Sequence, residues 1–415
     1  MTAQDAKTLP NVVVVGGGPA GLAIVRRLNA KLDLLKYNLV LVTATPYYTH
    51  LPACIRLVVQ PTSDLDASVN SVLAPYDGLV PRRCRVVVGR VVKVEEEEDM
   101  HEEVANENGN GVEGEKICGA WGGRKGVLVL DGTDERVKYD ALVLTTGSKW
   151  EGPLAFPGSR DEVKVWVEEW REKFEKAEDV VIVGGGATGL EFAGEIRDLS
   201  QTKRITVVHD QPLLLSDAYP NGFRKAVARN VRRRDATVAL DDSISSDEIS
   251  EGGTIRTGKG RLLVADLVIP CRGPRPNTDF LSALGEDALS ATGHVRVKPT
   301  LQMKYHPRIF AAGDVIDWDE QKQAIKYVAH AKVVVDNVIS VLKDRQPNAL
   351  YKGCYEAIVI ANGKSGGSTY YSFWGPHVQL GNLPSSIAKA RALKGPSRNR
   401  RLGFLERQAS RTGAR

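Results

Sequence analysis

The stretch Val12-Val13-Val14-Val15-Gly16-Gly17-Gly18-Pro19-Ala20-Gly21 decides the fold class of this 415-residue chain. Its four valines are typical of a strand that is buried on both faces of a parallel sheet. Three glycines follow with the spacing G-x-G-x-x-G, and the apolar pattern from Leu22 to Leu28 then predicts a helix. A strand, a glycine turn and a helix in this order predict a βαβ unit whose turn binds a diphosphate.

The same arrangement recurs far downstream in the chain. Val180-Val181-Ile182-Val183 leads into Gly184-Gly185-Gly186-Ala187-Thr188-Gly189 and a helical pattern from Leu190 to Ile196. Each unit continues into a second short strand, Leu39–Val42 in the first and Ile205–Val208 in the second. In each turn the first glycine permits the tight bend, the second lets the backbone approach a pyrophosphate, and the third lets helix and strand pack closely. Two such units predict two dinucleotide sites in one chain.

Neither second strand ends in the acidic residue that usually binds the ribose of a dinucleotide. Thr43 ends the first, and its hydroxyl can still donate or accept a hydrogen bond. His209 ends the second and is followed by Asp210, which can reach the ribose from one position further on. Because a missing acid beside a histidine also tolerates a 2′-phosphate, the sequence leaves NADH and NADPH open.

Length and composition fit a multidomain protein. A chain of 415 residues is too long for one ordinary core, and 42% hydrophobic with 26% charged residues is typical of soluble globular proteins. No apolar run is long enough to span a bilayer, and residues 1–10 carry no targeting pattern. We therefore expect a cytoplasmic protein. The sequence predicts nothing about its oligomeric state.

The formal net charge of +5 is unevenly distributed. An acidic run at Glu95–Asp99 contrasts with a tail that is basic from Lys389 onward. This tail either makes peripheral contact with an anionic membrane surface or is a solvated terminus, and both interpretations stay open. Without aromatic interleaving or a nucleic-acid motif, we expect no nucleic-acid partner. The five cysteines and seven histidines show no metal-ligand spacing, so we also expect no metal.

Two further strand ends carry polar groups. The apolar strand Asp140–Thr146 ends in Thr145-Thr146-Gly147-Ser148, and Ile309–Ala312 is followed by Gly313-Asp314. A carboxylate in the second position suits the ribityl chain of a flavin. The Gly313-Asp314 segment is informative because of its place in the order of motifs. It comes after the first glycine turn, the Thr-Gly strand end and the second glycine turn.

In this order the motifs resemble the pyridine nucleotide–disulfide oxidoreductase superfamily. Within it, the chain resembles the apoptosis-inducing-factor-like branch that includes ferroptosis suppressor protein and its fungal relatives. The resemblance covers roughly residues 11–403. Besides the motifs above, it rests on the segments Tyr47–Arg56, Arg272–Thr278 and Gly363–Gly367, and on Lys322 and His330.

The resemblance implies an α/β fold with two Rossmann-like dinucleotide-binding domains, for FAD and NAD(P)H, and a small C-terminal α+β domain. We expect the FAD-binding domain to comprise residues 1–160, with an acidic flexible loop at about 95–123, and to continue at 286–345. The NAD(P)H-binding domain would span 161–285. The C-terminal domain and the basic tail would span 346–415.

The resemblance also implies binding residues, position by position. For FAD they are Gly16, Gly18, Pro19, Ala20, Gly21, Thr43, Arg56, Val88, Thr146, Gly147, Gly313 and Asp314. For NAD(P)H they are Gly184, Gly186, Gly189, Glu191 and Asp210.

Three residues are predicted to be catalytic. Glu191 is expected near the carboxamide of the nicotinamide cofactor, and Lys322 and His330 near the isoalloxazine ring. A lysine there would stabilise the reduced flavin electrostatically. It is also possible to interpret Lys322 as a solvated side chain and His330 as a packed core residue. Glu195 shares a helix face with Glu191 and is equally well explained as a solvated or lysine-paired side chain.

The predicted function is hydride transfer from NAD(P)H to FAD, followed by electron transfer to a quinone-like or other small acceptor. Cys54 stands alone where disulfide reductases of the superfamily carry C-x₄-C, so no dithiol relay is expected. Because the branch that the chain resembles carries small residues at this site, a buried inert thiol is the favoured interpretation of Cys54, and a peroxide or thiol reductase that uses Cys54 stays open. It also leaves open a specialised biosynthetic flavin oxidoreductase and a slow-turnover NAD(P)H or redox-sensing signalling protein.

Overall fold

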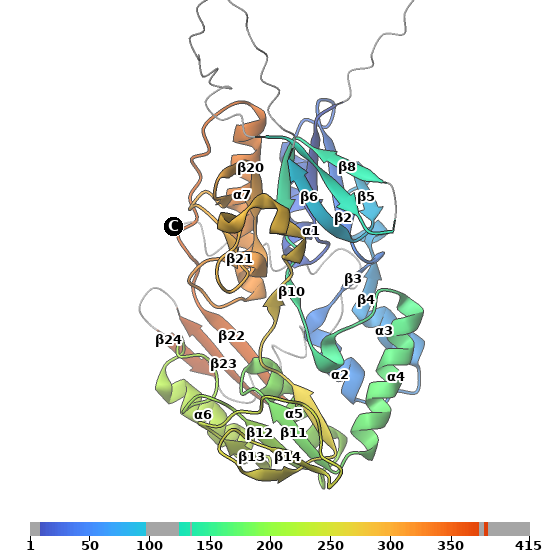
Figure 1. Ribbon diagram of the computed structural model, residues 1–415, viewed down its shortest axis with the longest axis vertical. Coiled ribbons are helices and arrows are strands. Elements are labelled where there is room, and N and C mark those ends of the chain that lie inside the picture. Colours follow the sequence, from blue (N-terminus) through green and yellow to red (C-terminus); the bar gives the residue numbers. More distant parts are fainter. Residues whose placement is uncertain (1–8, 97–123, 133–134, 373–376, 381–415) are drawn as a thin grey trace, which may run out of the picture.

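The structure is a computed structural model that describes residues 9–96, 124–132, 135–372 and 377–380 (Figure 1). Nearly all of the predicted acidic loop at 95–123 and the whole basic tail from Lys389 lie outside the described residues. The predictions of a flexible loop and of a membrane-contacting tail therefore stay predictions.

The valine run at the start of the chain is the centre of a six-stranded sheet. Strand β1 (Asn11–Val15) pairs in parallel with β2 (Asn38–Thr43) on one side and β9 (Ala141–Leu144) on the other. The sheet continues in parallel to β5 (Cys84–Val88) and β20 (His306–Ala311), and β19 (Gln302–Met303) adds an antiparallel edge. Helices α1 (Pro19–Lys31) and α7 (Tyr327–Leu342) pack against each other and against strands of this sheet. A 3₁₀ turn, η6 (Ala324–Lys326), leads directly into α7.

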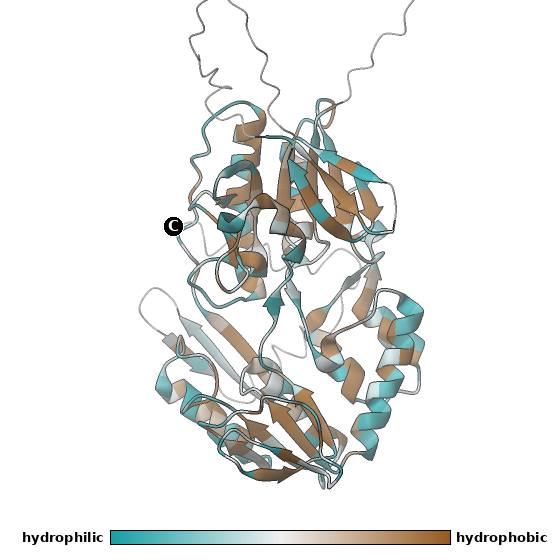
Figure 2. Cartoon of the chain, viewed as in Figure 1, coloured by the Kyte–Doolittle hydropathy of each residue, from teal (hydrophilic) through white to brown (hydrophobic). Residues whose placement is uncertain are grey.

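The second glycine motif belongs to a four-stranded parallel sheet. Its order is β13 (Ala236–Ala239), β12 (Arg204–Val208), β11 (Asp179–Val183) and β16 (Leu267–Pro270). Helix α5 (Ala187–Leu199) follows β11, and α6 (Asn221–Arg232) follows β12. The strands of the six-stranded and the four-stranded sheet are predominantly hydrophobic, as buried strands require (Figure 2).

A two-stranded link joins the two sheets. Strand β10 (Ser148–Lys149) pairs antiparallel with β17 (Arg275–Pro276), and β10 lies between the upper and lower parts of the molecule in Figure 1. Further along the chain, α4 (Arg160–Lys176) begins with a capping box of Ser159 and Glu162. Helices α2 (Leu51–Val59) and α3 (Leu65–Val72) pack against α4 and share its hydrophobic cluster. Segments far apart in the sequence therefore form one core beside the second sheet.

The β-branched run at 85–94 by itself predicts one continuous strand, and this prediction is wrong. The run divides into β5 and β6 (Val91–Glu96). The N–H of Gly89 donates to Thr43 O at 2.8 Å, which ends the pairing of β5 with β2, and the chain then turns. Strand β6 instead forms an antiparallel sheet with β7 (Gly126–Leu130) and β8 (Arg136–Tyr139).

The described C-terminal segment is a three-stranded antiparallel sheet of β22 (Ala357–Asn362), β23 (Gly366–Ser372) and β24 (His377–Leu380). Strand β22 packs against α5, where a Cβ on Gly194 would overlap the backbone of Asn362 and Gly363. The short elements that remain are β3 (Tyr47–Thr49), β4 (Leu73–Pro75), η1 (Tyr76–Gly78), η2 (Gly152–Leu154), β14 (Thr254–Arg256), β15 (Leu262–Val264), η3 (Asp279–Leu284), η4 (Glu286–Ala288), β18 (Val295–Arg296), η5 (Gly313–Val315) and β21 (Ile316–Asp317).

Candidate functional site

The first glycine turn has the geometry of an anion-binding site. Gly16 adopts φ +108°, and a Cβ there would overlap the carbonyl of Thr145. The position of a Cβ on Gly18, by contrast, has no atom within 4 Å. Gly18 caps α1 without a side-chain hydrogen bond, so the first amides of the helix, from Ala20 and Gly21, have no side-chain cap. These open amides and the positive end of the helix dipole fit a diphosphate.

The second glycine turn repeats this geometry. Gly184 adopts φ +122°, where a Cβ would overlap the carbonyl of Cys271, and the space beside Gly186 is open. Gly189 packs against the carbonyl of Gly184 so closely that a side chain would not fit. Gly186 caps α5 with no side-chain hydrogen bond. The turn therefore fits a second diphosphate.

The Thr-Gly and Gly-Asp segments meet at the first turn. The hydroxyl of Thr145 donates to Val15 O at 2.8 Å and to Gly16 O at 3.0 Å. The hydroxyl of Ser148 donates to Asp314 Oδ2 at 2.9 Å. A Cβ on Gly313, which has φ +80°, would lie 3.1 Å from Ala20 Cβ. The structure thus brings Asp314 to the start of α1, as a contact with a flavin bound there requires.

Thr146 and Gly147 lie at the link between the sheets. The hydroxyl of Thr146 donates to Asn277 O at 2.6 Å, and the N–H of Asn277 donates to Gly147 O at 3.0 Å. Gly147 adopts φ +65°, which only glycine adopts readily. These two predicted flavin contacts therefore also join β10 to β17.

Thr43 and Val88 end neighbouring strands and are register partners. Val88 is 52% exposed, whereas Thr43 is buried and its hydroxyl lies 3.2 Å from that of Tyr76. Tyr76 in turn donates to Gly17 O at 3.2 Å, and a Cβ on Gly17 would overlap its ring. Sequence reasoning missed Tyr76, because no motif links it to a glycine turn 59 residues away.

Arg56 on α2 forms an ion pair with Glu195 on α5, the helix that follows the second glycine turn. Its Nε and Nη2 contact both carboxylate oxygens of Glu195 on α5, at 2.6–3.2 Å. The side chain of Glu195 is 4% exposed and that of Arg56 is 32% exposed. Gln60 also donates to Glu195 O at 2.7 Å. The structure therefore gives Arg56 a contact that the sequence did not predict, and its predicted contact with FAD stays a prediction.

Glu191 contacts the C-terminal sheet. Its Oε1 accepts a hydrogen bond of 3.1 Å from the N–H of Ala361 on β22. This places the carboxylate where α5 meets that strand, close to the contact between Gly194 and Gly363. Its predicted approach to the nicotinamide carboxamide stays a prediction.

Lys322 is half-buried and points at main-chain oxygens. Its Nζ donates to Ile316 O at 2.8 Å and to Trp318 O at 3.1 Å. Burial lowers the pKa of this ammonium below its usual value, against the opposing effect of Glu320, Asp314 and Asp317. The interpretation of Lys322 as a fully solvated lysine is therefore wrong.

His330 is buried and positions the Gly-Asp turn. Its Nδ1 accepts from the N–H of Gly313 at 3.1 Å, and its Nε2 lies 3.1 Å from Glu320 Oε1. Because Nδ1 is an acceptor, the hydrogen-bond pattern assigns the proton to Nε2. His330 thus contacts the segment that carries Asp314, and a direct role at the isoalloxazine stays a prediction.

A buried ionic network supports His330. Lys326 forms an ion pair with Glu356 and lies 3.7 Å from Glu320 Oε2, while the hydroxyl of Tyr351 donates to Glu320 at 2.5 Å. Burial alone would raise the pKa of Glu320, but the hydrogen bonds from His330 and Tyr351 hold it below its usual value. Sequence reasoning missed this network, since its members come from both ends of the segment 320–356.

Cys54 lies in the hydrophobic cluster around α2 and is fully buried. Burial raises the pKa of its thiol well above the usual range, and Sγ lies 3.6 Å from His50 O. This environment disfavours the thiolate that a redox cysteine requires.

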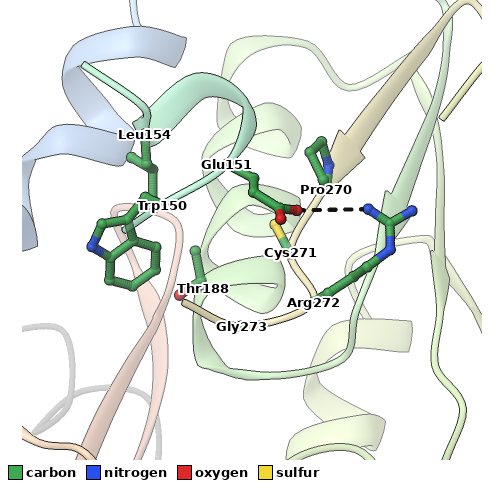
Figure 3. A pocket seen from close by; sticks show the side chains of 8 residues that line it. All are labelled: Trp150, Glu151, Leu154, Thr188, Pro270, Cys271, Arg272 and Gly273. Carbon is green, nitrogen blue, oxygen red and sulfur yellow. Dashed lines mark ion pairs between the residues drawn. The ribbon is translucent and has the colours of Figure 1, made fainter. Parts of the chain in front are cut away.

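A narrow pocket lies beside the second glycine turn (Figure 3). Thr188, in the first turn of α5, lines it together with the segment that follows β16 and the segment that follows β10. Arg272 also lines it and forms ion pairs with Glu151 at 3.9 Å and with Asp247 at 2.5 Å. The full lining is Trp150, Glu151, Leu154, Thr188, Pro270, Cys271, Arg272 and Gly273. The pocket therefore lies at the start of α5, next to the second glycine turn.

Metal-binding clusters and membrane-spanning helices are both absent from the described part of the chain. The described residues contain no group of three or more His, Cys, Asp or Glu side chains that could hold a metal ion. Within the same ranges, no helix has the length and apolarity needed to cross a membrane.

Comparisons with known proteins agree with this geometry. The family model "Pyridine nucleotide-disulphide oxidoreductase" matches residues 10–335. The chain is 44% identical over 273 residues to the FAD-dependent oxidoreductase FVFD30 of Flammulina velutipes. The aligned region covers 66% of this chain and 84% of that protein. It is 26% identical over 395 residues to mouse (Mus musculus) ferroptosis suppressor protein 1, covering 92% of this chain and 93% of that one.

A solved structure shares the fold. The sulfide:quinone oxidoreductase of Aquifex aeolicus superposes with a TM-score of 0.70 at 14% identity, covering 93% of this chain and 90% of that one. The matched family, the named relatives and the two open glycine turns together show that the chain belongs to the pyridine nucleotide-disulphide oxidoreductase family and is an FAD-dependent NAD(P)H oxidoreductase.

Proposed function

We propose that this enzyme takes a hydride from NAD(P)H bound at the turn Gly184–Gly189, passes it to FAD bound at the turn Gly16–Gly21, and delivers electrons to a quinone-like acceptor. The observation that carries the proposal is the pair of glycine turns. Each turn has a positive-φ first glycine, an open second glycine and a helix start with no side-chain cap. FAD supplies the redox chemistry, whereas the protein supplies position and electrostatics.

Different residues at the first turn are assigned to different parts of FAD. The amides of Ala20 and Gly21 bind the diphosphate, and Asp314 binds the ribityl chain. Pro19 donates no hydrogen bond but fixes the first helical φ. Gly313 keeps Asp314 in place because the Gly313 amide is held by its hydrogen bond to His330.

Lys322 provides positive charge beside Asp314. Its ammonium is anchored on two main-chain carbonyls and interacts with the Asp314 charge. A fixed cation in a half-buried site stabilises negative charge that develops near it. Glu191 is the residue we assign to the nicotinamide side, at the junction of α5 and β22.

The quinone-like acceptor has indirect support. The branch that the sequence resembles includes ferroptosis suppressor protein, and the Aquifex aeolicus structure with the same fold is a sulfide:quinone oxidoreductase. The Cys54-dependent peroxide or thiol reductase loses support, because the Cys54 thiol is fully buried. No observation favours the biosynthetic oxidoreductase or the slow redox sensor over the quinone reductase.

The test is anaerobic reduction of the purified, FAD-loaded protein by NADH and by NADPH, followed by reoxidation with a panel of quinones. We expect the visible flavin absorbance to bleach with at least one nucleotide and to recover on addition of a quinone. Absence of flavin absorbance even after reconstitution would contradict the proposal. Bleaching without recovery would point to another acceptor, and bleaching too slow for turnover would favour the sensor.

Membrane association through residues 389–415 is a separate proposal. Pelleting with vesicles that contain anionic lipid, with the full chain and with a chain that ends at residue 388, tests it. Equal binding of the two forms would dismiss the basic tail.

A further inference from the structure

The end of β12 decides which nucleotide the second site takes. In dinucleotide-binding folds, the group at this strand end meets the 2′ position of the adenosine ribose. That position carries a hydroxyl in NADH and a phosphate in NADPH. The candidates here are His209 and Asp210, which follow β12 directly.

His209 turns inward, away from the ribose edge. Its Nδ1 accepts a hydrogen bond of 3.2 Å from the N–H of Gly185, and its ring packs so closely that a Cβ on Gly185 would overlap it. The side chain is only 13% exposed. Burial lowers its pKa below the usual value, against the opposing effect of Asp210, and so disfavours the charged ring. His209 therefore supports the glycine turn and offers no cation to a phosphate.

Asp210 faces outward into an open hollow. Its side chain is 65% exposed and lines the hollow together with Asp241, Asp242 and Lys259. The hollow lies among the segments that follow β12 and β13 and the loop between β14 and β15. Because open α/β sheets bind ligands outside the carboxyl ends of their strands, this is where the adenosine half of a dinucleotide on the second turn would lie.

The hollow is acidic. Its lining has three carboxylates against one ammonium, that of Lys259. Asp242 is held rigidly, since its Oδ1 accepts from the N–H groups of Ser243 and Lys259, each at 3.0 Å. Arg261 lies 3.8 Å from the other oxygen of Asp242 and offsets that charge. Within the lining, Asp210 and Asp241 are left with only Lys259 to balance them.

A nearby arginine is not available to a phosphate. The guanidinium of Arg224 is buried and donates to the carbonyls of the segment 213–215, at 3.0–3.1 Å. The segment 209–215 itself contains no lysine or arginine. The arginine fork that suits a 2′-phosphate is therefore absent from the described strand end and its loop.

We propose that the enzyme is selective for NADH, and that Asp210 is the residue that discriminates against NADPH. The inference rests on the proposed function, because it takes the second turn as the nicotinamide nucleotide site. The Asp210 carboxylate accepts a hydrogen bond from a ribose 2′-hydroxyl but repels a 2′-phosphate, which carries about −1.5 to −2 charges at pH 7. At a separation of about 6 Å in a water-like dielectric, this repulsion lowers the affinity for the phosphorylated nucleotide about tenfold.

The test uses fragments that lack the nicotinamide. ADP-ribose and 2′-phospho-ADP-ribose are titrated calorimetrically into the FAD-loaded protein at low ionic strength, where charge effects are least screened. We expect ADP-ribose to bind about tenfold more tightly or better. Asp210→Asn should narrow this ratio several-fold, and Asp210→Arg should reverse it. Asp217→Asn is the matched control, because Asp217 lies in the same loop and does not line the hollow.

Each outcome decides a separate point. Equal or tighter binding of the 2′-phosphorylated fragment by the wild-type protein overturns NADH selectivity and leaves the proposed function intact. An unchanged ratio in Asp210→Arg, with the same melting temperature as the wild type, overturns the role of Asp210. Failure of both fragments to bind contradicts the second turn as a nucleotide site, and the proposed function falls with the inference.

Discussion

Replacing Glu195 by alanine tests what Arg56 does in this enzyme. Arg56 on α2 and Glu195 on α5 form a bidentate ion pair at 2.6–3.2 Å between residues 139 positions apart. Removing one partner of a fully buried pair costs about 3–5 kcal/mol. Arg56 is 32% exposed, so water can solvate its guanidinium again, and we expect a loss of about 1–3 kcal/mol.

The assay is thermal unfolding followed by circular dichroism, with flavin fluorescence recorded in parallel. We expect Glu195→Ala to lower the melting temperature by several degrees. In a double-mutant cycle with Arg56→Met, the two changes should couple by about 1 kcal/mol or more. Glu172→Ala serves as the control, because Glu172 forms an exposed ion pair with Lys176 on α4, and it should leave the melting temperature unchanged. An unchanged melting temperature in Glu195→Ala, together with a shifted flavin spectrum in Arg56→Met, would refute this reasoning and place Arg56 at the flavin instead.

Three further predictions follow from the site. Gly16→Ala should abolish FAD binding, because a Cβ would overlap the carbonyl of Thr145. Gly184→Ala should instead keep the yellow colour of bound flavin and lose its bleaching by NADH. Loss of flavin from both variants would show that the turns are not separate sites. His330→Ala removes the acceptor of the Gly313 amide and should weaken FAD binding about tenfold or more. The free flavin is measured after ultrafiltration, and retention of FAD as in the wild type would count against a positioning role for His330. Lys322→Met should lower the midpoint potential of the flavin by roughly 30 mV, which is equivalent to about 1.4 kcal/mol for a two-electron couple. Lys332 is exposed on α7, so Lys332→Met serves as the control and should not change the potential. Equal potentials in the two variants would show that Lys322 does not act on the flavin.

The glycine turns could be predicted from sequence because their requirements are local. A positive φ at Gly16 and Gly184, an open approach at Gly18 and Gly186, and a helix start with no side-chain cap all depend on a few consecutive residues. The parallel strands were predictable for the same reason, since a short, continuous β-branched run is typical of a strand that is buried on both faces. The division of the run at 85–94 was not predictable, because it depends on which neighbouring strand each half meets.

The side chains around the turns depend on packing between distant segments. In the sequence, His209 and Asp210 both follow the second strand of the second βαβ unit, and the sequence does not decide which of them faces the ribose. The inward hydrogen bond from Gly185 to His209 then leaves Asp210 as the group at the surface. Tyr76 at the first turn and the network of Lys326, Glu320 and Glu356 around His330 likewise have no local signature.

By itself, then, the sequence determined the two nucleotide-binding turns and the parallel strands that present them, because steric and hydrogen-bonding rules act over a few residues. Only the tertiary structure decided that Arg56 binds Glu195, that Cys54 is sealed in a hydrophobic cluster and that Asp210 faces the hollow beside the second turn. These three outcomes depend on how segments far apart in the chain are brought together when their apolar faces are buried, and no short stretch of sequence contains that information.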